Sequence, residues 1–487
     1  MHDAKKRTVG GCGGALSRLD DVCRQVLAKV TPTREERDRV LRLAGEVIAR
    51  VSEEAGKLGV KVKPMLVGSM AKDTWISGDQ DVDVFMVFPQ TYSFEEIGKL
   101  GLEIARRVTG GRGEEQYAEH PYLRAEVDGY MFDFVPCFEI EEAAQLRSSV
   151  DRTPLHTRYV LSRMDERLRG ETRLLKAFMK GVGVYGAELK TGGFSGYLCE
   201  LLTIKYGSFE SVLTAAVSWG SQEVIDIERH YDDPEKARRM FNSPLIVVDP
   251  VDPRRNVAAA VTLQRLSEFR AAAMFFLEEP SESFFFPPKL SPLTVDELAA
   301  KMRERGTSMI FIEFGTPKLP PDNLWGQLTR SLQSIQKTLE GGGFRVISRD
   351  VWSSGEKTVF IFELESRRIP AAKRHLGPPP ASPHQRRFIE KHLNAPSTLS
   401  GPRVEGDRWV VEVKRKYTEA DTLLRDALKN PSGIGLGSYV AEKVSEGFSL
   451  YVDEEILSYY SRNREFQEHF TLTITGKPRW LTQRKEE

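Results

Sequence analysis

The sequence predicts an α+β protein with several domains. Its 487 residues are more than one hydrophobic core organises, since single cores stop growing at about 250–300 residues. Apolar residues alternate with a period of two, as in strands, in the first part of the chain and again beyond its middle. Between these parts they recur at helical spacing. We therefore expect a head with a mixed sheet, a helical neck, and an α/β body with an inserted basic tail.

The head is predicted to span residues 1–165. Residues 1–14 end in GGCGG and are expected to be flexible. Apolar residues at helical spacing then predict an entry helix near Ala15–Val30 and a second helix near Thr33–Leu58. The sheet of the head is expected to follow these two helices.

The most informative segment is VGSMAKDTWISGDQDVDVFMVFP, residues 67–89. Gly68-Ser69 predicts the start of a helix, and helix N-termini with small residues present backbone N–H groups to anions. About a dozen residues later, Asp81 and Asp83 alternate with valine on an apolar strand, so both carboxylates project from one face. A lone Asp-x-Asp is most often a solvated turn, but solvated aspartates are unexpected among so many apolar residues.

A third carboxylate is predicted beside this pair. The segment RAEVDGYMFDFVPCF contains two short apolar runs joined by Asp128-Gly129, the strongest short signal for a β-hairpin. On the second run Asp133 shares a face with Met131 and Val135. Taken alone, Asp133 could equally be an edge residue that faces water. Next to Asp81 and Asp83, it is predicted to complete a cluster of acids.

Clustered carboxylates repel one another unless a cation neutralises them. Hard oxygen ligands suit Mg²⁺, which binds through one or two carboxylates together with substrate phosphates. Two such ions can activate an attacking hydroxyl and stabilise a leaving pyrophosphate. The sequence therefore predicts a nucleotidyl-transfer site in which Asp81, Asp83 and Asp133 are catalytic residues and metal ligands.

The neck, residues 166–290, is expected to be helical and to bind the nucleotide. Apolar residues at helical spacing predict helices near Glu171–Gly181, Phe194–Tyr206 and Asn256–Leu277. Lys176 lies on the first of these helices and offers a point charge for phosphate, while Tyr185 follows in a glycine-rich turn and could stack or hydrogen-bond. Lys180 shares a helix face with Lys176 and is more simply part of a solvated surface, and Tyr185 could also close a core.

The body is predicted from residues 291–365 and 445–487. A strand at Ser308–Phe314, a helix near Asp322–Leu339 and strands near Phe344–Val351 and Thr358–Leu364 give a β-α-β-β order that suggests a ferredoxin-like sheet. The segments Ser449–Val452 and Phe470–Thr475 could return to this sheet.

The inserted tail, residues 366–444, is rich in basic side chains. Lys373, Arg374 and His375 precede a proline cluster, and Gln385-Arg386-Arg387 follows it. Basic side chains neutralise phosphates and aromatic ones stack on unpaired bases, so this part is predicted to bind RNA. Charge runs are also common on ordinary solvated surfaces.

Composition sets the class of protein. Lys+Arg and Asp+Glu both number 70, so a nucleic-acid binder of zero net charge must collect its basic residues on one face. The four cysteines are too widely spaced for a zinc site or a disulfide framework. No apolar run approaches the length of a membrane span and no apolar signal core follows the basic start. We expect a soluble, cytoplasmic protein.

The order of Gly-Ser, Asp-x-Asp and a third Asp resembles the nucleotidyltransferase superfamily that includes DNA polymerase beta and poly(A) polymerases. The sequence around these motifs resembles that of the class I, archaeal-type CCA-adding enzymes, which are tRNA nucleotidyltransferases. The matching segments run in order over the first 260 or so residues and continue more weakly beyond them: GSMAKDTW, DVDVFMVFP, EHPY, FDFVPCF, DRTPLHTRY, RLLKAFMKGVGVYGAE, GGFSGYLCELL, DPVDPRRNVAAA and HLGPPP.

The resemblance implies template-independent addition of C, C and A to the tRNA 3′ end from CTP and ATP, with Mg²⁺ as the cofactor. It also implies a polymerase-beta-like head and a tRNA-binding tail, and it allows a homodimer. Most members carry arginine where this chain has Lys72. A lysine keeps the positive charge there but cannot make the two parallel hydrogen bonds to phosphate that a guanidinium makes. The nucleotide-binding residues that it implies, including the base-recognising Arg255, are Gly68, Ser69, Lys72, His156, Lys176, Tyr185 and Arg255.

Three other functions share part of this pattern. A poly(A) polymerase or an oligoadenylate synthetase would carry the same three carboxylates, and would differ in using ATP without CTP. A nucleotidyltransferase acting on a small molecule would not need the basic tail. A tRNA-binding protein with an inactive head would have no reason to keep three acids on apolar strands.

Overall fold

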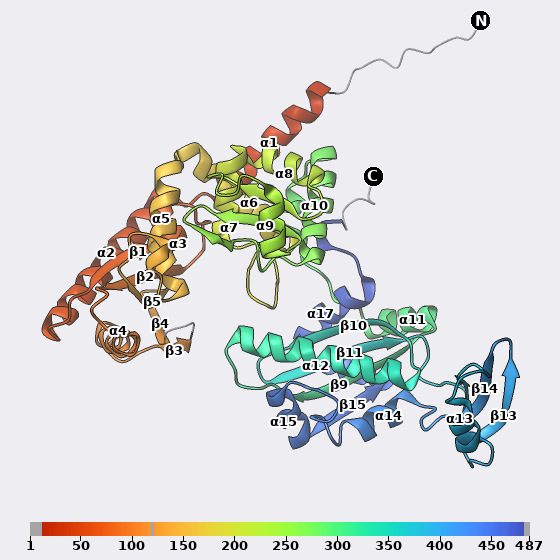
Figure 1. Cartoon of the computed structure of the whole chain (residues 1–487). Coiled ribbons are helices and arrows are strands. Elements are labelled where there is room, and N and C mark those ends of the chain that lie inside the picture. Colours follow the sequence, from red (N-terminus) through yellow and green to blue (C-terminus); the bar gives the residue numbers. More distant parts are fainter. Residues whose placement is uncertain (1–11, 118–120, 482–487) are drawn as a thin grey trace, which may run out of the picture. The chain divides into compact units, whose positions relative to one another are not determined.

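The computed structural model describes residues 12–117 and 121–481, and the chain divides into two compact units, Met1–Lys289 with Pro478–Glu487 and Leu290–Lys477. Each unit is described by itself (Figure 1). Most of the segment expected to be flexible, 1–14, lies outside the described residues, whereas residues 12–14 belong to the first turn of a helix. Among the described residues, no helix combines the length and the apolar character needed to cross a membrane.

The head is built on a five-stranded sheet of order β1-β2-β5-β4-β3. Strands β2 and β5 are parallel and the other neighbours are antiparallel, so the sheet is mixed as expected. The elements of the head are α1 (Cys12–Val30), α2 (Arg34–Lys57), β1 (Lys63–Val67), α3 (Gly68–Lys72), β2 (Asp81–Phe88), α4 (Phe94–Thr109), β3 (Glu114–Tyr117), β4 (Pro121–Val127), β5 (Tyr130–Phe138), η1 (Ala143–Gln145), η2 (Ser149–Asp151) and α5 (Arg152–Arg163).

Local sequence signals account for the main elements of the head. Thr33 and Glu36 form a capping box that starts α2, as the predicted boundary required. The predicted hairpin is confirmed, with Asp128 at φ 49° and Gly129 at φ 81° between β4 and β5. One face of the sheet, including Val84 and Phe132, packs against α2 and α4. The aspartates of β2 and β5 therefore project from the opposite face.

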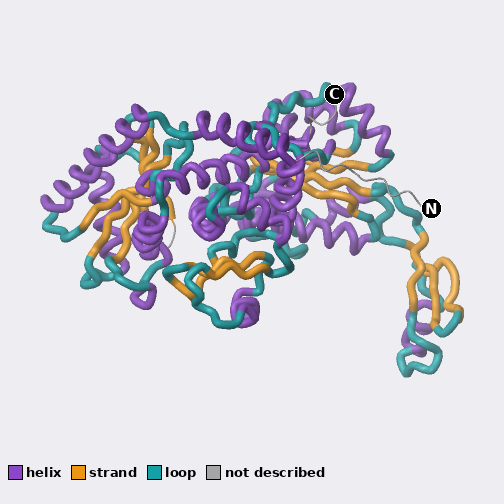
Figure 2. Tube along the Cα trace, turned by 90° about the horizontal axis from the view of Figure 1, so that it is seen from above, coloured by secondary structure: helices purple, strands orange, loops and turns teal. Residues whose placement is uncertain are grey.

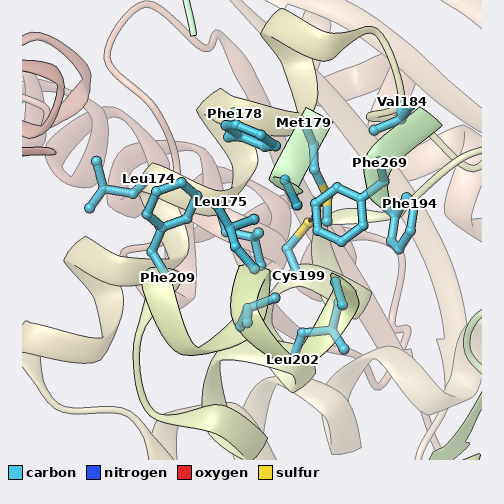
Figure 3. Close-up of a cluster of buried hydrophobic side chains, with 14 of the residues drawn as sticks. Leu174, Leu175, Phe178, Met179, Val184, Phe194, Cys199, Leu202, Phe209 and Phe269 are labelled. Carbon is cyan, nitrogen blue, oxygen red and sulfur yellow. Dashed lines mark hydrogen bonds between the residues drawn. The ribbon is translucent and has the colours of Figure 1, made fainter. Parts of the chain in front are cut away.

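The neck combines helices with a small sheet of order β6-β7-β8. Its helices pack around Phe178, whose ring lies 5.6 Å from that of Phe209 and 5.4 Å from that of Phe276; Figure 3 shows this cluster. The elements are α6 (Glu166–Val182), α7 (Gly196–Tyr206), α8 (Phe209–Ser218), β6 (Glu223–Asp226), α9 (Pro234–Phe241), β7 (Leu245–Asp249), β8 (Asp252–Asn256), α10 (Leu263–Glu278), η3 (Glu282–Phe284) and η4 (Arg479–Leu481).

Three features of the neck differ from the expectation. The sheet β6-β7-β8 lies in a part expected to be helical, and the last helix begins at Leu263 because the residues from Asn256 complete a strand and a turn. The end of the chain also returns to the neck, since the Trp480 ring stacks on Phe284 with centroids 5.3 Å apart. Residues 445–487 were all expected in the body.

The body contains a four-stranded antiparallel sheet of order β10-β11-β9-β15. Helices α12, α14 and α15 pack on one face of it, and α11, α16 and α17 on the other. The elements are α11 (Val295–Arg305), β9 (Ser308–Gly315), α12 (Pro321–Gly342), β10 (Val346–Ser353), β11 (Lys357–Leu364), α14 (Ala420–Ala427), α15 (Ser438–Glu446), β15 (Phe448–Val452), α16 (Glu455–Arg462) and α17 (Arg464–Thr475).

The return of Ser449–Val452 to this sheet is confirmed by the pairing of β15 with β9. The segment Phe470–Thr475 does not form a strand; it ends helix α17, whose Phe470 packs against Phe311 of β9 with ring centroids 5.0 Å apart. A helix buries the same apolar residues against the sheet without extending it.

The tail forms its own three-stranded sheet of order β12-β14-β13, seen apart from the body sheet in Figure 2. Its elements are β12 (Ala372–Leu376), α13 (Gln385–His392), β13 (Thr398–Glu405) and β14 (Arg408–Lys414). Helices α14 and α15, which the predicted boundary at 444 placed in the tail, belong to the body because Leu424 and Val440 are fully buried in its core. The tail sheet therefore ends near Lys414.

Candidate active site

The three predicted carboxylates come together at one end of the head sheet. Parallel pairing of β2 with β5 sets Asp83 directly opposite Asp133 and places Asp81 opposite Met131. The side chain of Asp133 is 19% exposed and that of Asp81 is 70% exposed. The cluster thus has one open carboxylate at its rim and two enclosed ones at its base.

The pKa values of the buried acids show that the carboxylates of this cluster lie close enough to repel one another. Burial raises the pKa of Asp83, opposed by the Lys72 ammonium and reinforced by Asp81. Burial also raises the pKa of Asp133 to about 6; the Arg124 guanidinium works against this rise, while Asp83 and Asp81 add to it. Carboxylates held in this way gain from any added cation.

Arg124 of β4 supplies part of that positive charge. Its guanidinium bonds to Asp81, and its Nε lies 3.6 Å from Asp133 Oδ1. The same Oδ1 atom is buried and accepts no hydrogen bond. Buried oxygens without a donor are uncommon in native proteins, so this one points to a cation as its missing partner.

The donor set fits a hard divalent cation. Within residues 12–117 and 121–481, no group of three or more His, Cys, Asp or Glu side chains is gathered as a self-sufficient metal centre. Mg²⁺ does not need one, because it keeps water molecules and substrate phosphates among its ligands. Two facing carboxylates, one with an orphaned oxygen, match this requirement.

Gly68 allows the close approach of strand and helix beside the carboxylates. It starts α3 with φ 69°, and a Cβ atom there would lie 2.0 Å from Asp83 Oδ2. Only glycine fits both the left-handed backbone and this contact. Ser69 is the next residue on α3 and is half-buried. The predicted helix start at Gly68-Ser69 is confirmed.

Lys72 and Lys176 meet at a fully buried acid. Lys72 Nζ donates to Glu200 Oε2 at 2.6 Å, and Lys176 Nζ lies 3.4 Å from Glu200 Oε1. Lys176 also donates to the carbonyl and the hydroxyl of Thr74, both at 3.0 Å. This network joins α3 of the head to α6 and α7 of the neck. Lys176 is therefore buried, whereas Lys180, the lysine interpreted as part of a solvated surface, is exposed.

A second buried acid gathers His156 and Arg255. Asp249 Oδ2 lies 2.8 Å from His156 Nε2 and accepts from Arg255 at 2.9 Å, while its Oδ1 accepts from Tyr197 at 3.3 Å. The His156 ring stacks on Tyr197 with centroids 4.0 Å apart. Burial lowers the pKa of His156, which favours its neutral form as the donor to Asp249.

Tyr185 lies beside the lysine network. A Cβ on Gly196 would lie 3.0 Å from its hydroxyl and 3.6 Å from Lys176 Nζ, and Lys180 lies over its ring at 5.4 Å from the centroid. Burial raises the pKa of the Tyr185 hydroxyl, which stays protonated and able to donate. Lys180 itself pairs with Asp79 at 2.7 Å.

The sequence interpretation missed five residues of this site: Thr74, Arg124, Tyr197, Glu200 and Asp249. Glu200 sits in the apolar helix segment CELL, and Asp249 ends the apolar strand LIVVD. An acid inside an apolar run was the signal used for Asp81 and Asp83, and it would have found both of these acids.

Three family models match the chain in order. One described as "Nucleotidyltransferase domain" covers residues 47–156, one described as "tRNA nucleotidyltransferase, second domain" covers residues 170–286, and one described as "CCA-adding enzyme, C-terminal domain" covers residues 305–453. The first model spans the strands that carry the three carboxylates. The second spans Lys176, Tyr185, Glu200, Asp249 and Arg255.

Whole-chain relatives agree with these models. The chain is 39% identical over 448 residues to a CCA-adding enzyme of Methanothermobacter thermautotrophicus, covering 91% of this chain and 95% of the relative. It is 42% identical to the CCA-adding enzyme of Methanosarcina acetivorans and 36% identical to that of Haloarcula marismortui, in each case over 90% of this chain and 95% of the relative.

Proposed function

The chain belongs to the CCA-adding enzymes and adds CCA to the 3′ end of tRNA, and we propose that Asp81, Asp83 and Asp133 form the reacting centre of this transfer. The observation that carries the proposal is the register that sets Asp83 opposite Asp133. Each round would join the tRNA 3′-hydroxyl to the α-phosphorus of CTP or ATP, with pyrophosphate leaving. No protein nucleophile and no template are needed for this step.

The carboxylates would position the reacting groups and hold Mg²⁺. Asp81 and Asp83 would face the triphosphate, and Asp133 would face the attacking hydroxyl. When bound, Mg²⁺ supplies charge neutralisation for the hydroxyl and the leaving pyrophosphate. The orphaned Asp133 Oδ1 supports this assignment, because a buried oxygen without a donor is available to a cation.

The incoming nucleotide would lie between the head and the neck of the first unit. Gly68, Ser69 and Lys72 would meet the triphosphate, with Lys176 and Tyr185 beside them and His156 at the second buried acid. Arg255 is 36% exposed while its partner Asp249 is fully buried, so the guanidinium is oriented and still open to a ligand. That combination supports a role for Arg255 in recognising the incoming base.

The second unit would bind the tRNA. Its main sheet fits a ferredoxin-like arrangement. Along the chain the elements follow as β9-α12-β10-β11 and then α15-β15, with the tail inserted between β11 and α14. In space the strands lie in the order β10-β11-β9-β15. Lys373 and Arg374 on β12 and Arg387 on α13 are exposed basic residues of the tail. Folded tRNA is recognised largely by its shape and its backbone, which suits such a surface. The enzyme would act in the cytoplasm, where it meets tRNA.

The experiment is extension of a tRNA that ends at its discriminator base, with Mg²⁺ and CTP, ATP or both, and with products resolved by length. Two additions with CTP and a third only when ATP is present are expected. A long ladder with ATP alone would contradict CCA addition and indicate a poly(A)-type polymerase. Bound tRNA without any extension would indicate a binding protein with an inactive head.

A further inference from the structure

Glu200 is the centre of a buried network that joins head and neck beside the carboxylates. It is fully buried on α7, and its two oxygens take three donors: Lys72 Nζ at 2.6 Å, Thr74 Oγ1 at 2.5 Å and Lys176 Nζ at 3.4 Å. Only an ionised carboxylate accepts at both oxygens without bringing a donor of its own. A glutamine at this position would turn an N–H group toward another donor.

The network carries a net positive charge. Two ammonium groups share one carboxylate, and all three side chains are at most 7% exposed. Burial raises the pKa of Glu200, but the neighbouring lysines and hydrogen bonds outweigh it and hold this pKa below its ordinary value, while burial lowers the pKa of Lys176. Removing the carboxylate would leave two buried ammonium groups near each other without a counter-charge, which is strongly unfavourable.

The two lysines differ in what they can offer a ligand. All three N–H donors of Lys176 are used, two on Thr74 and one on Glu200. Among the hydrogen bonds of the described residues, Lys72 uses one donor, and its ammonium group also lies 5.7 Å from the centre of the Tyr197 ring. Lys72 is also close enough to Asp83 to lower the pKa of that carboxyl. Of the two lysines, Lys72 thus keeps N–H donors for a ligand. Its hydrogen bond to Glu200 fixes the direction of its ammonium group.

We propose that Glu200 is a positioning residue for nucleotide binding, which supplies the buried counter-charge of Lys176 and directs Lys72 toward the triphosphate. Glu200 itself would not touch the nucleotide. The inference rests on the proposed placement of the triphosphate at Lys72. It goes beyond that placement by assigning the nucleotide affinity in part to an acid, which would repel a triphosphate if it faced one.

The test compares Glu200→Gln with Glu200→Asp in the full-length protein. Gln keeps the shape and removes the charge, whereas Asp keeps the charge on a shorter side chain. Glu200→Gln is expected to raise KM for CTP and ATP about tenfold with kcat within about threefold, because binding and not the reacting centre is affected. Glu200→Asp is expected to lie closer to the wild type. The reverse order, with Gln active and Asp impaired, would overturn the charge role.

Two controls separate this inference from a general loss of stability. Glu363 is another buried carboxylate, bonded to Arg305 at 2.6 and 2.8 Å in the body, and Glu363→Gln should lower the melting temperature without changing KM. Lys72→Met tests the underlying placement. An unchanged KM in this variant would mean that the triphosphate does not bind at Lys72. A raised KM in Lys72→Met with an unchanged KM in Glu200→Gln would overturn only the role of Glu200.

A third variant covers the case in which neither Glu200 variant folds. Thr74 is fully buried, and its hydroxyl donates to Glu200 and accepts from Lys176. Thr74→Val keeps the volume and removes this link, so KM for CTP should rise about threefold with tRNA affinity unchanged. Equal or tighter CTP binding, measured by titration calorimetry, would contradict the proposal.

Discussion

Asp83 and Asp133 face each other across the parallel strands β2 and β5, in register, although fifty residues separate them in the chain. Their nearest neighbours on the strands are apolar and buried, so neither acid serves the core of the head. A pair of acids at such a position costs stability, which fits the proposal that the reaction needs both. Each acid can therefore be tested with a variant of its own.

Asp83→Asn should abolish CCA addition and leave tRNA binding unchanged. The amide keeps the shape of the side chain and removes the charge that would hold Mg²⁺, so turnover should fall by about a thousandfold or more. Turnover is measured by single-nucleotide extension, and tRNA binding by filter retention. Asp128→Asn is the control, because Asn tolerates the positive φ of this hairpin position and Asp128 has no part in the proposed reaction. Near-normal turnover of Asp83→Asn would mean that Asp83 is not part of the reacting centre.

Asp133→Asn should stabilise the protein in the absence of divalent cations. The folded pKa of Asp133, about 6, lies above its ordinary value of 3.8, so the folded protein binds more protons between these values. The free energy of unfolding therefore falls as pH rises from about 4 to 6 and stays lower above that range. At pH 8 the variant should gain about 1–2 kcal/mol.

Mg²⁺ gives the complementary measurement for Asp133. Thermal melting at pH 8 should show that added Mg²⁺ raises the melting temperature of the wild type more than that of Asp133→Asn, because the variant lacks one of the charges that the ion neutralises. Asp407→Asn, at an exposed residue of the tail, should respond to Mg²⁺ as the wild type does. An equal response of wild type and Asp133→Asn would mean that Mg²⁺ does not bind there.

Gly68→Ala should inactivate the enzyme, whereas Gly78→Ala should not. Both glycines have a positive φ, 69° and 86°, so alanine strains the backbone at each by about 1–2 kcal/mol. At Gly68 the added Cβ also collides with Asp83, while at Gly78 nothing lies within 4 Å. Comparable melting temperatures with a turnover at least about a hundredfold lower in Gly68→Ala are expected. Equal turnover in the two variants would show that the close approach of Gly68 to Asp83 is unimportant.

The head was predicted well because its signals are local. The alternation around Asp81 and Asp83, the Asp128-Gly129 turn and the Thr33 cap each need only a few neighbouring residues. Pairing of β2 with β5 then followed from their apolar character. The five-residue run Leu245–Asp249 carried a comparable strand signal, but it was interpreted as part of a helical region.

Other features depend on long-range interactions that no local pattern contains. Strand β8 includes Pro253 and two arginines and has no strand character of its own; Asn256 fixes it by accepting from Val247 N and donating to the Leu245 carbonyl. Helix α14 belongs to the body only because the chain returns there after the tail. Glu200 meets Lys72 across 128 positions, so the acid could be noticed in the sequence but its three donors could not.

Arg255→Ala should weaken nucleotide binding, and Arg254→Ala should not. Arg255 is held by the fully buried Asp249 at 2.9 Å, whereas Arg254 is 68% exposed and lies 3.6 Å from Asp252. We expect KM for CTP and ATP to rise at least about tenfold in the first variant and less than about threefold in the second. Steady-state extension assays on the same tRNA measure both. A larger rise of KM in Arg254→Ala than in Arg255→Ala would mean that Arg254, and not Arg255, recognises the base.

Two exposed basic residues of the tail, Lys373 on β12 and Arg387 on α13, should contribute to tRNA affinity. Removal of both charges should raise the Kd for tRNA about tenfold at low salt, because each cation that neutralises a phosphate releases counterions. The slope of log K against log salt should become shallower by about one for each phosphate that is no longer neutralised. Lys99→Ala with Lys337→Ala, which removes two exposed lysines outside the tail, is the matched control. An unchanged slope in the tail variant, measured by filter binding across a salt series, would mean that the tRNA backbone does not lie against this sheet and helix.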